Sequence, residues 1–142
     1  DELAELAKSL GIADRVIFRG QLSGRDEVKA ELDAADLFVL PSHQEGLPRA
    51  MVEAMARALP CIGSTVGGIP ELLPAEDLVP PGDVDALSKK ISEVLRDPQR
   101  MKEMSARSLE TAREYEEGVL RARREEFYDY VKNKTAEWGE KC

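Results

Sequence analysis

Residues 37–56 read LFVLPSHQEGLPRAMVEAMA, and this stretch decides the fold. The apolar run 37–40 is stopped by Pro41 and suits a strand that is buried on both faces. A loop follows, and from Pro48 the residues favour a helix that continues to about residue 58. The stretch therefore predicts a strand, a loop and a helix in direct succession, as in the repeating unit of a parallel α/β sheet.

The flanking sequence continues this alternation. Apolar residues at helical spacing predict helices over 3–10, 26–34, 84–95, 98–115 and 119–132, and a short helix over 70–73. Short apolar runs predict further strands at 16–18, 61–63 and 78–79. We therefore expect an α/β fold, a partial Rossmann-like parallel sheet of about four short strands flanked by helices and followed by long C-terminal helices. Ligands are expected where the carboxyl ends of strands meet helix starts.

Length and composition indicate one soluble globular domain over residues 1–142. Hydrophobic residues make up 42% and charged residues 34%, and no apolar run suggests a transmembrane segment. The formal charge of −8 repels a phosphate backbone, and the basic cluster Arg121, Arg123 and Arg124 is followed at once by acids. Nucleic acid is therefore not an expected partner. Cys61 and Cys142 match no metal spacing, which favours a reducing, cytoplasmic compartment.

The helix that begins near Pro48 has the features of an anion site. Proline at the first helical position loses no hydrogen bond, because that N–H would have no partner within the helix. The N–H groups of Arg49 and Ala50 are then free donors, with the positive end of the helix dipole behind them. This arrangement suits a phosphate.

Glu53 is the only polar residue between Ala50 and Ala56, in a helix that its apolar composition predicts to be buried on most sides. A buried carboxylate needs a hydrogen-bonding partner. One candidate is the hydroxyl pair of a ribose, because Glu53 lies ~7.5 Å along the axis from Pro48. The other is an ion pair with Arg49, one turn earlier. The residues alone leave both open.

Four other features have two interpretations each. Glu45 can be interpreted as a ligand for the hydroxyls of a sugar that is joined to a phosphate at the helix start, or as an exposed loop acid. His43 faces an acceptor, or it is a surface residue. The Gly67-Gly68 turn approaches a ligand, or turn geometry alone explains it. The Asp-x-Asp motif at Asp83 has the form of a metal site, but Asp83 is well placed to cap the next helix, so we expect no metal.

Several motifs occur in a fixed order along the chain. Two glutamates separated by seven residues lie in EGLPRAMVEAMA at 45–56, and around them lie VIFRG at 16–20, ADLFVLPS at 35–42, LPCIGS at 59–64, GGIPEL at 67–72 and VPPGD at 79–83. This ordered set resembles the large retaining family four of GT-B glycosyltransferases, over about residues 3–130. The resemblance implies the C-terminal, nucleotide-sugar-binding domain of such an enzyme, truncated at its N-terminal side.

The resemblance also implies roles for particular residues. Glu45 would bind the hydroxyls of the donor sugar and orient it for catalysis, and Glu53 would bind the ribose. Residues 46–50 would offer backbone contacts to sugar and phosphate, and Leu22 backbone contacts to the base. The implied donor-site residues are Leu22, Glu45, Gly46, Leu47, Pro48, Arg49, Ala50 and Glu53. No metal or cofactor is implied, and the donor is a nucleoside diphosphate sugar, UDP- or GDP-linked.

The activity implied by the resemblance is retaining transfer of the sugar to an acceptor hydroxyl. The acceptor, a saccharide or a lipid-linked molecule, would be bound mainly by a missing N-terminal domain. We expect a cytoplasmic enzyme that in its full-length form is peripheral to the inner face of the membrane. Two alternatives remain open, a donor-binding or regulatory module without activity of its own and a GT-B nucleotide-sugar epimerase.

The missing segment has structural consequences. In the family, two absent strands separate the strands matched at 16–18 and 37–40, and an absent Arg and Lys clamp the pyrophosphate, so we expect the isolated chain to be inactive. We expect either that the 16–18 strand lies beside the 37–40 strand or that two chains pair, and we favour a homodimer. Two departures from the family lie outside the expected chemistry: Ala58 replaces a usual glycine, and Glu76-Asp77 replace a glycine before the last strand.

Overall fold

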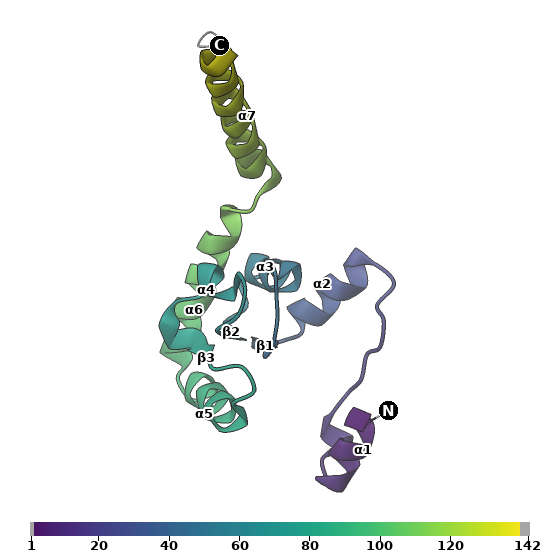
Figure 1. Cartoon of the computed structure of the whole chain (residues 1–142). Helices are drawn as coiled ribbons and strands as arrows, with labels where there is room; N and C mark the ends of the chain where they lie inside the picture. Colours follow the sequence, from purple (N-terminus) through teal and green to yellow (C-terminus); the bar gives the residue numbers. More distant parts are fainter. Residues whose placement is uncertain (1, 140–142) are drawn as a thin grey trace. The chain divides into compact units, whose positions relative to one another are not determined.

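The computed structural model describes residues 2–139, in two compact units, Asp1–Glu31 and Leu32–Cys142. In the first unit, α1 (Glu2–Ser9) is followed by one turn of 3-10 helix at Ala13–Arg15 (Figure 1). The next helix, α2 (Arg25–Asp33), begins in the first unit and ends in the second. The helices expected at 3–10 and 26–34 are therefore confirmed. All the strands belong to the second unit.

The strand expected at 16–18 is wrong. Residues 16–18 form no regular structure, and Ile17 is 71% exposed. A strand exists only through bonds to a neighbour, and an apolar composition does not supply one. Because residues 16–18 form no strand, the expected pairing of such a strand with the 37–40 strand is not formed. Association of two chains stays a prediction.

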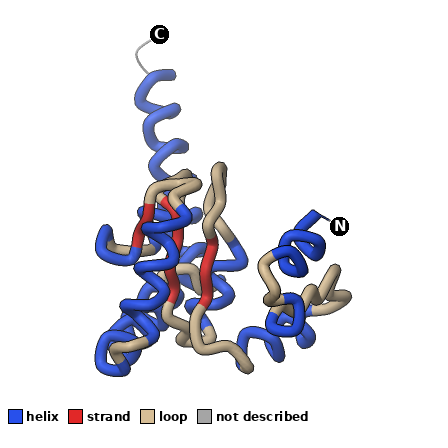
Figure 2. Tube along the Cα trace, turned by 90° about the horizontal axis from the view of Figure 1, so that it is seen from below, coloured by secondary structure: helices blue, strands red, loops and turns tan. Residues whose placement is uncertain are grey.

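The sheet has three parallel strands in the order β1-β2-β3, where about four were expected. They are β1 (Phe38–Leu40), β2 (Cys61–Ser64) and β3 (Leu78–Val79), which confirms the strands expected at 37–40, 61–63 and 78–79. Leu40 lies opposite Gly63, and Ser64 lies opposite Val79. The three strands lie side by side in Figure 2, and their carboxyl ends meet at one edge of the sheet.

Five helices of this unit come after its strands in the chain, one after β1, one after β2 and three after β3. They are α3 (Arg49–Ala56), α4 (Ile69–Leu72), α5 (Val84–Leu95), α6 (Pro98–Arg113) and α7 (Glu117–Gly139), with a 3-10 turn at Ala75–Asp77. The long C-terminal helices are confirmed, although α7 extends to Gly139 and not to residue 132. Within the part of the chain that the structure describes, no helix combines the length and hydropathy needed to cross a membrane.

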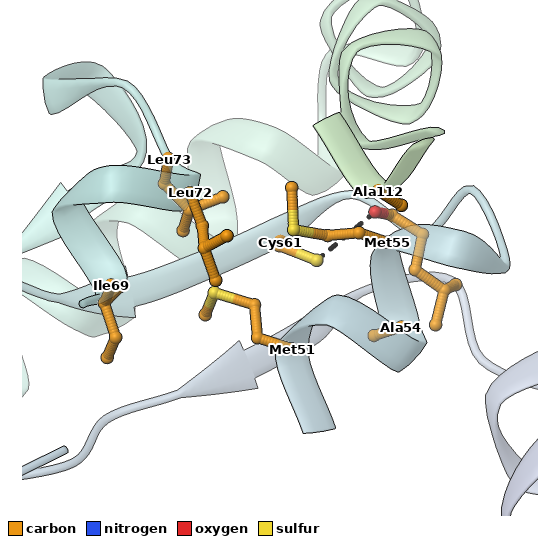
Figure 3. Close-up of a cluster of buried hydrophobic side chains, with 9 residues drawn as sticks. Met51, Ala54, Met55, Cys61, Ile69, Leu72, Leu73 and Ala112 are labelled. Carbon is orange, nitrogen blue, oxygen red and sulfur yellow. Dashed lines mark hydrogen bonds between the residues drawn. The ribbon is translucent and has the colours of Figure 1, made fainter. Parts of the chain in front are cut away.

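Helices cover both faces of the sheet. Successive side chains of β2 therefore point into two different cores. Cys61 lies in a buried cluster with side chains of α3 and α4 (Figure 3). The next residue, Ile62, packs instead with Val94 of α5 and Met104 of α6. A central strand buried on both faces is the feature expected of a parallel sheet.

A buried carboxylate ties α6 to the 3-10 turn that precedes the third strand. The Asp77 side chain is 1% exposed and accepts hydrogen bonds from Arg100, at 3.0 Å, and from Arg107. The carbonyl of Glu76 also accepts from Lys90, at 2.6 Å. Removing one partner of a buried ion pair costs about 3–5 kcal/mol. The departure from the family at Glu76-Asp77 is thus a structural feature of this chain.

The other departure, Ala58, ends α3 in a left-handed conformation. Ala58 has φ of +59°, its N–H donates to the carbonyl of Met55 at 2.9 Å, and the N–H of Leu59 donates to the carbonyl of Ala54 at 3.1 Å. This pair of bonds is the Schellman motif, in which glycine is favoured because it has no Cβ. Alanine takes the same conformation here at an energetic cost.

Candidate donor-binding site

Three loops meet at the carboxyl edge of the sheet, residues 41–48 after β1, 65–68 after β2 and 80–83 after β3. Two contacts join them. The N–H of Gly68 donates to the carbonyl of Gly46 at 2.8 Å. The ring of His43 lies against Gly82, where an added Cβ would stand 3.1 Å from His43 Cε1. This edge is where ligands bind in doubly wound sheets.

The start of α3 offers free backbone donors, as expected. Pro48 is the N-cap and not the first helical residue, a correction of one position, with φ −77° and ψ 103°. Its carbonyl accepts from the N–H groups of Met51 and Val52, at 3.1 and 3.3 Å. The N–H groups of Arg49 and Ala50 have no acceptor among the described residues, and both residues are exposed. They remain available to an anion.

Glu53 lies on the exposed face of α3, so the expectation that it is buried is wrong. Its side chain is 52% exposed, while Met51, Ala54 and Met55 form the buried face. The helix has an apolar composition partly because of alanines that are exposed, Ala50 and Ala56, so its composition did not show which face is buried. The ion pair with Arg49 exists only at 4.0 Å between Nη2 and Oε1, with the arginine side chain 87% exposed. Such exposed pairs contribute about 0–1 kcal/mol.

Glu45 is not a fully exposed loop acid. The residue is half-buried, and the hydroxyl of Ser42 donates to its Oε1 at 2.7 Å. The carbonyl of Ser42 in turn accepts from the hydroxyl of Ser64, the last residue of β2, which is fully buried. Sequence reasoning missed both serines, because serine in a loop is common and only the fold brings residue 64 to residue 42.

The Gly67-Gly68 turn packs against the loop that contains Glu45. A Cβ at Gly67 would stand 2.0 Å from the carbonyl oxygen of Glu45, and one at Gly68 would stand 2.9 Å from that of Gly46. Gly67 also has φ of +52°, where L side chains are strained. Neither sequence interpretation of this turn included the contact. The two glycines let the turn and the loop approach to backbone contact.

The structure places the other predicted residues as follows. Gly46 and Leu47 are exposed in the loop, and Pro48 is buried at the start of α3. Leu22 belongs to the first unit, in the irregular segment before α2, and its contact with a base stays a prediction. His43 is exposed.

The metal interpretation of Asp83 gains no support, and Cys61 is part of the core. Among the described residues, no group of three or more His, Cys, Asp or Glu is arranged to hold a metal ion. Asp83 is the N-cap of α5, and its carboxylate accepts from the N–H of Ala86 at 2.9 Å, as expected. Burial raises the pKa of the Cys61 thiol to about 12, and its Sγ donates to the carbonyl of Leu59 at 3.3 Å (Figure 3). Cys61 is a protonated core residue, and Cys142 lies outside the described residues.

The carboxyl edge of this parallel sheet, where ligands bind in doubly wound folds, thus carries a helix start with free N–H groups and a carboxylate in the loop before it. The family model described as "Glycosyl transferases group 1" matches residues 1–113. The chain therefore belongs to the group 1 glycosyltransferases, and its fold is that of the GT-B glycosyltransferases.

One curated relative is the N-acetyl-alpha-D-glucosaminyl L-malate synthase of Bacillus anthracis. It is 36% identical over 115 residues, which are 79% of this chain and 29% of that protein. The chain thus spans less than a third of this relative.

Solved structures give the same picture. Sucrose-phosphate synthase from Thermosynechococcus elongatus has a TM-score of 0.82 and 28% identity, over 92% of this chain and 33% of that one. HepE of Anabaena in complex with UDP has a TM-score of 0.71 and 27% identity, over 78% of this chain and 31% of the HepE chain. The C-terminal domain of the group 1 protein LpcC from Francisella tularensis has a TM-score of 0.71 and 25% identity, over 78% and 58%. The chain is similar to the C-terminal domain of this family.

Replacement of Gly67 by alanine tests the contact between the turn and the loop. The new Cβ meets a backbone carbonyl and the φ angle is unfavourable, so we expect Gly67→Ala to lower the free energy of unfolding by about 2–3 kcal/mol. Urea denaturation followed by circular dichroism measures this. Gly20→Ala is the matched control, because Gly20 also has a positive φ, +63°, and a Cβ there meets nothing within 4 Å. Equal stability of the two variants would contradict the contact.

Proposed function

We propose that this chain is the donor-binding domain of a retaining glycosyltransferase that uses a nucleoside diphosphate sugar. The observation that carries the proposal is the loop 41–48 with the start of α3, where two free N–H groups and the half-buried carboxylate of Glu45 belong to one short segment. A pyrophosphate needs hydrogen-bond donors and a sugar needs acceptors, and this segment offers both. Membership of the group 1 glycosyltransferases supports the reaction class.

The start of α3 suits the leaving group of such a transfer. As the glycosidic bond breaks, negative charge grows on the departing pyrophosphate. The N–H groups of Arg49 and Ala50 point out of the helix start, and donors that are oriented before the reaction stabilise such charge. Packing of α3 against the core fixes the backbone of Arg49 and Ala50, because Met51 and Met55 of the same helix are only 0% and 1% exposed. The helix therefore need not rearrange to bind the leaving group.

Glu53 suits the ribose of the same ligand. It follows Arg49 by one turn, on the exposed face of the helix, so it lies beyond the free donors along the axis. Its contact with Arg49 is long and exposed, and it competes weakly with a pair of hydroxyls that donate to both carboxylate oxygens. Glu45, on the other side of the helix start, is the acceptor for the sugar.

The proposal extends to the donor, the acceptor and the location. The complex of HepE with UDP supports a UDP-linked donor, and a GDP-linked sugar is the other candidate. The acceptor, a saccharide or a lipid-linked molecule, would bind to a further domain of a longer protein, working at the cytoplasmic face of the membrane. We propose that the 142 residues alone do not transfer sugar.

Glu53→Ala tests the ribose assignment. We expect it to weaken binding of UDP by about 1–3 kcal/mol, because two ligand hydroxyls lose a charged acceptor. Isothermal calorimetry on the full-length protein measures the affinity. Glu110→Ala, which removes an exposed glutamate of α6, is the control and leaves the affinity unchanged. If Glu53→Ala binds UDP as tightly as the control, the assignment is wrong.

Glu45→Ala tests the sugar assignment. Because Glu45 is proposed to contact only the sugar, its loss should weaken binding of the nucleotide sugar and leave binding of the bare nucleoside diphosphate nearly unchanged. The measurement compares UDP with UDP-glucose, and GDP with GDP-mannose, in the wild-type and variant proteins. Equal losses for a nucleotide and its sugar derivative would show that Glu45 does not recognise the sugar.

A further inference from the structure

Glu45 is held by hydrogen bonds that start in the sheet. Ser64 ends β2 opposite Val79 of β3, so the ladder fixes its backbone. Its side chain is fully buried, and its hydroxyl donates to the carbonyl of Ser42. The hydroxyl of Ser42 then donates to Oε1 of Glu45 at 2.7 Å. Two hydroxyl groups thus connect the central strand to the carboxylate.

The backbone around Glu45 is fixed from the opposite side as well. The carbonyl of Glu45 lies against Gly67, where no Cβ fits, and the carbonyl of Gly46 accepts from the N–H of Gly68. Residues 42, 45 and 46 are therefore all tied to the end of β2 or to the turn after it. The remaining freedom of Glu45 lies in its side-chain rotamers, and the bond from Ser42 removes it.

We propose that Ser42 is a positioning residue for recognition of the donor sugar, which it orients through the Glu45 carboxylate. This inference rests on the proposed role of Glu45. With Oε1 engaged by Ser42, Oε2 is the oxygen left without a protein donor among the described residues, and it is the principal acceptor for a sugar hydroxyl. A carboxylate that is oriented before binding loses less rotamer entropy when the ligand arrives. Ser64 acts one step further back, by holding Ser42.

Two variants of Ser42 separate a missing hydroxyl from a changed backbone. Ser42→Ala removes the donor to Oε1 but keeps the carbonyl that accepts from Ser64. Ser42→Thr keeps a hydroxyl on the same carbon and is expected to restore the bond. Ser92→Ala is the matched control, because Ser92 is exposed on α5, away from the three loops.

The first measurement needs no ligand. Crystal structures of the Ser42 variants should show the Glu45 carboxylate displaced in Ser42→Ala and in its wild-type position in Ser42→Thr, with the backbone of 42–48 unchanged in both. A carboxylate that keeps its wild-type position in Ser42→Ala overturns the positioning role, whatever the site binds.

The second measurement compares UDP with UDP-glucose by calorimetry on the full-length protein. We expect Ser42→Ala to lose about three- to ten-fold in affinity for UDP-glucose, the effect of one side chain that must be ordered on binding, with UDP within two-fold of wild type. Ser42→Thr and Ser92→Ala should match wild type with both ligands. An equal loss for UDP and UDP-glucose, or no loss for either, overturns the role in sugar recognition.

Failure of the proposed function gives a different result. In that case Glu45→Ala binds UDP-glucose as tightly as wild type does, and the inference about sugar recognition falls with it. The crystal structures would still decide whether Ser42 orients the Glu45 carboxylate.

Discussion

The candidate site depends on the absence of a side chain at residue 67. The backbone of the turn after β2 reaches the carbonyl of Glu45 so closely that a Cβ would stand 2.0 Å from it. This approach, with the bond from Gly68 to Gly46, turns the loop after β1 from a free surface segment into a supported one. Everything proposed for Glu45 requires a loop that is held in this way.

The same constraint continues into the core. Gly63 of β2 lies beneath both α3 and α4, where an added Cβ would stand 2.6 Å from Ile69 and 3.0 Å from Met51. Small residues along β2 and its turn therefore let the loop and both helices pack against one strand. Since α3 is fixed by this packing, its free N–H groups have a fixed direction, which electrostatic stabilisation of a leaving group requires. Stability and the proposed chemistry use the same close contacts.

Much of this fold was predictable from the sequence, and the failures have physical reasons. The strands predicted from the apolar runs at 37–40, 61–63 and 78–79 were correct, because each of these segments has a strand composition and also lies beside another strand with which it pairs. The run at 16–18 has the same composition and forms no strand, because apolar composition alone does not supply hydrogen-bond partners for the backbone. Glu53 was expected to be buried because alanines were counted as core residues, although alanine is also common on exposed helix faces. The support for this loop from Ser64 and Gly67 could not be predicted, because it depends on parallel register, which joins residues more than twenty positions apart. Ser42 lies only three residues from Glu45, but a loop serine gives no signal of the bond that it makes.

The central claim is that the start of α3 binds the pyrophosphate of a nucleotide sugar. Titration of the isotope-labelled full-length protein with UDP to millimolar concentration, followed by amide NMR, tests it most directly. The account predicts that the largest shifts occur at the N–H groups of Arg49 and Ala50 and that they saturate together. Saturable shifts confined to other parts of the chain, or no shift at these two amides at the highest UDP concentration, would contradict it.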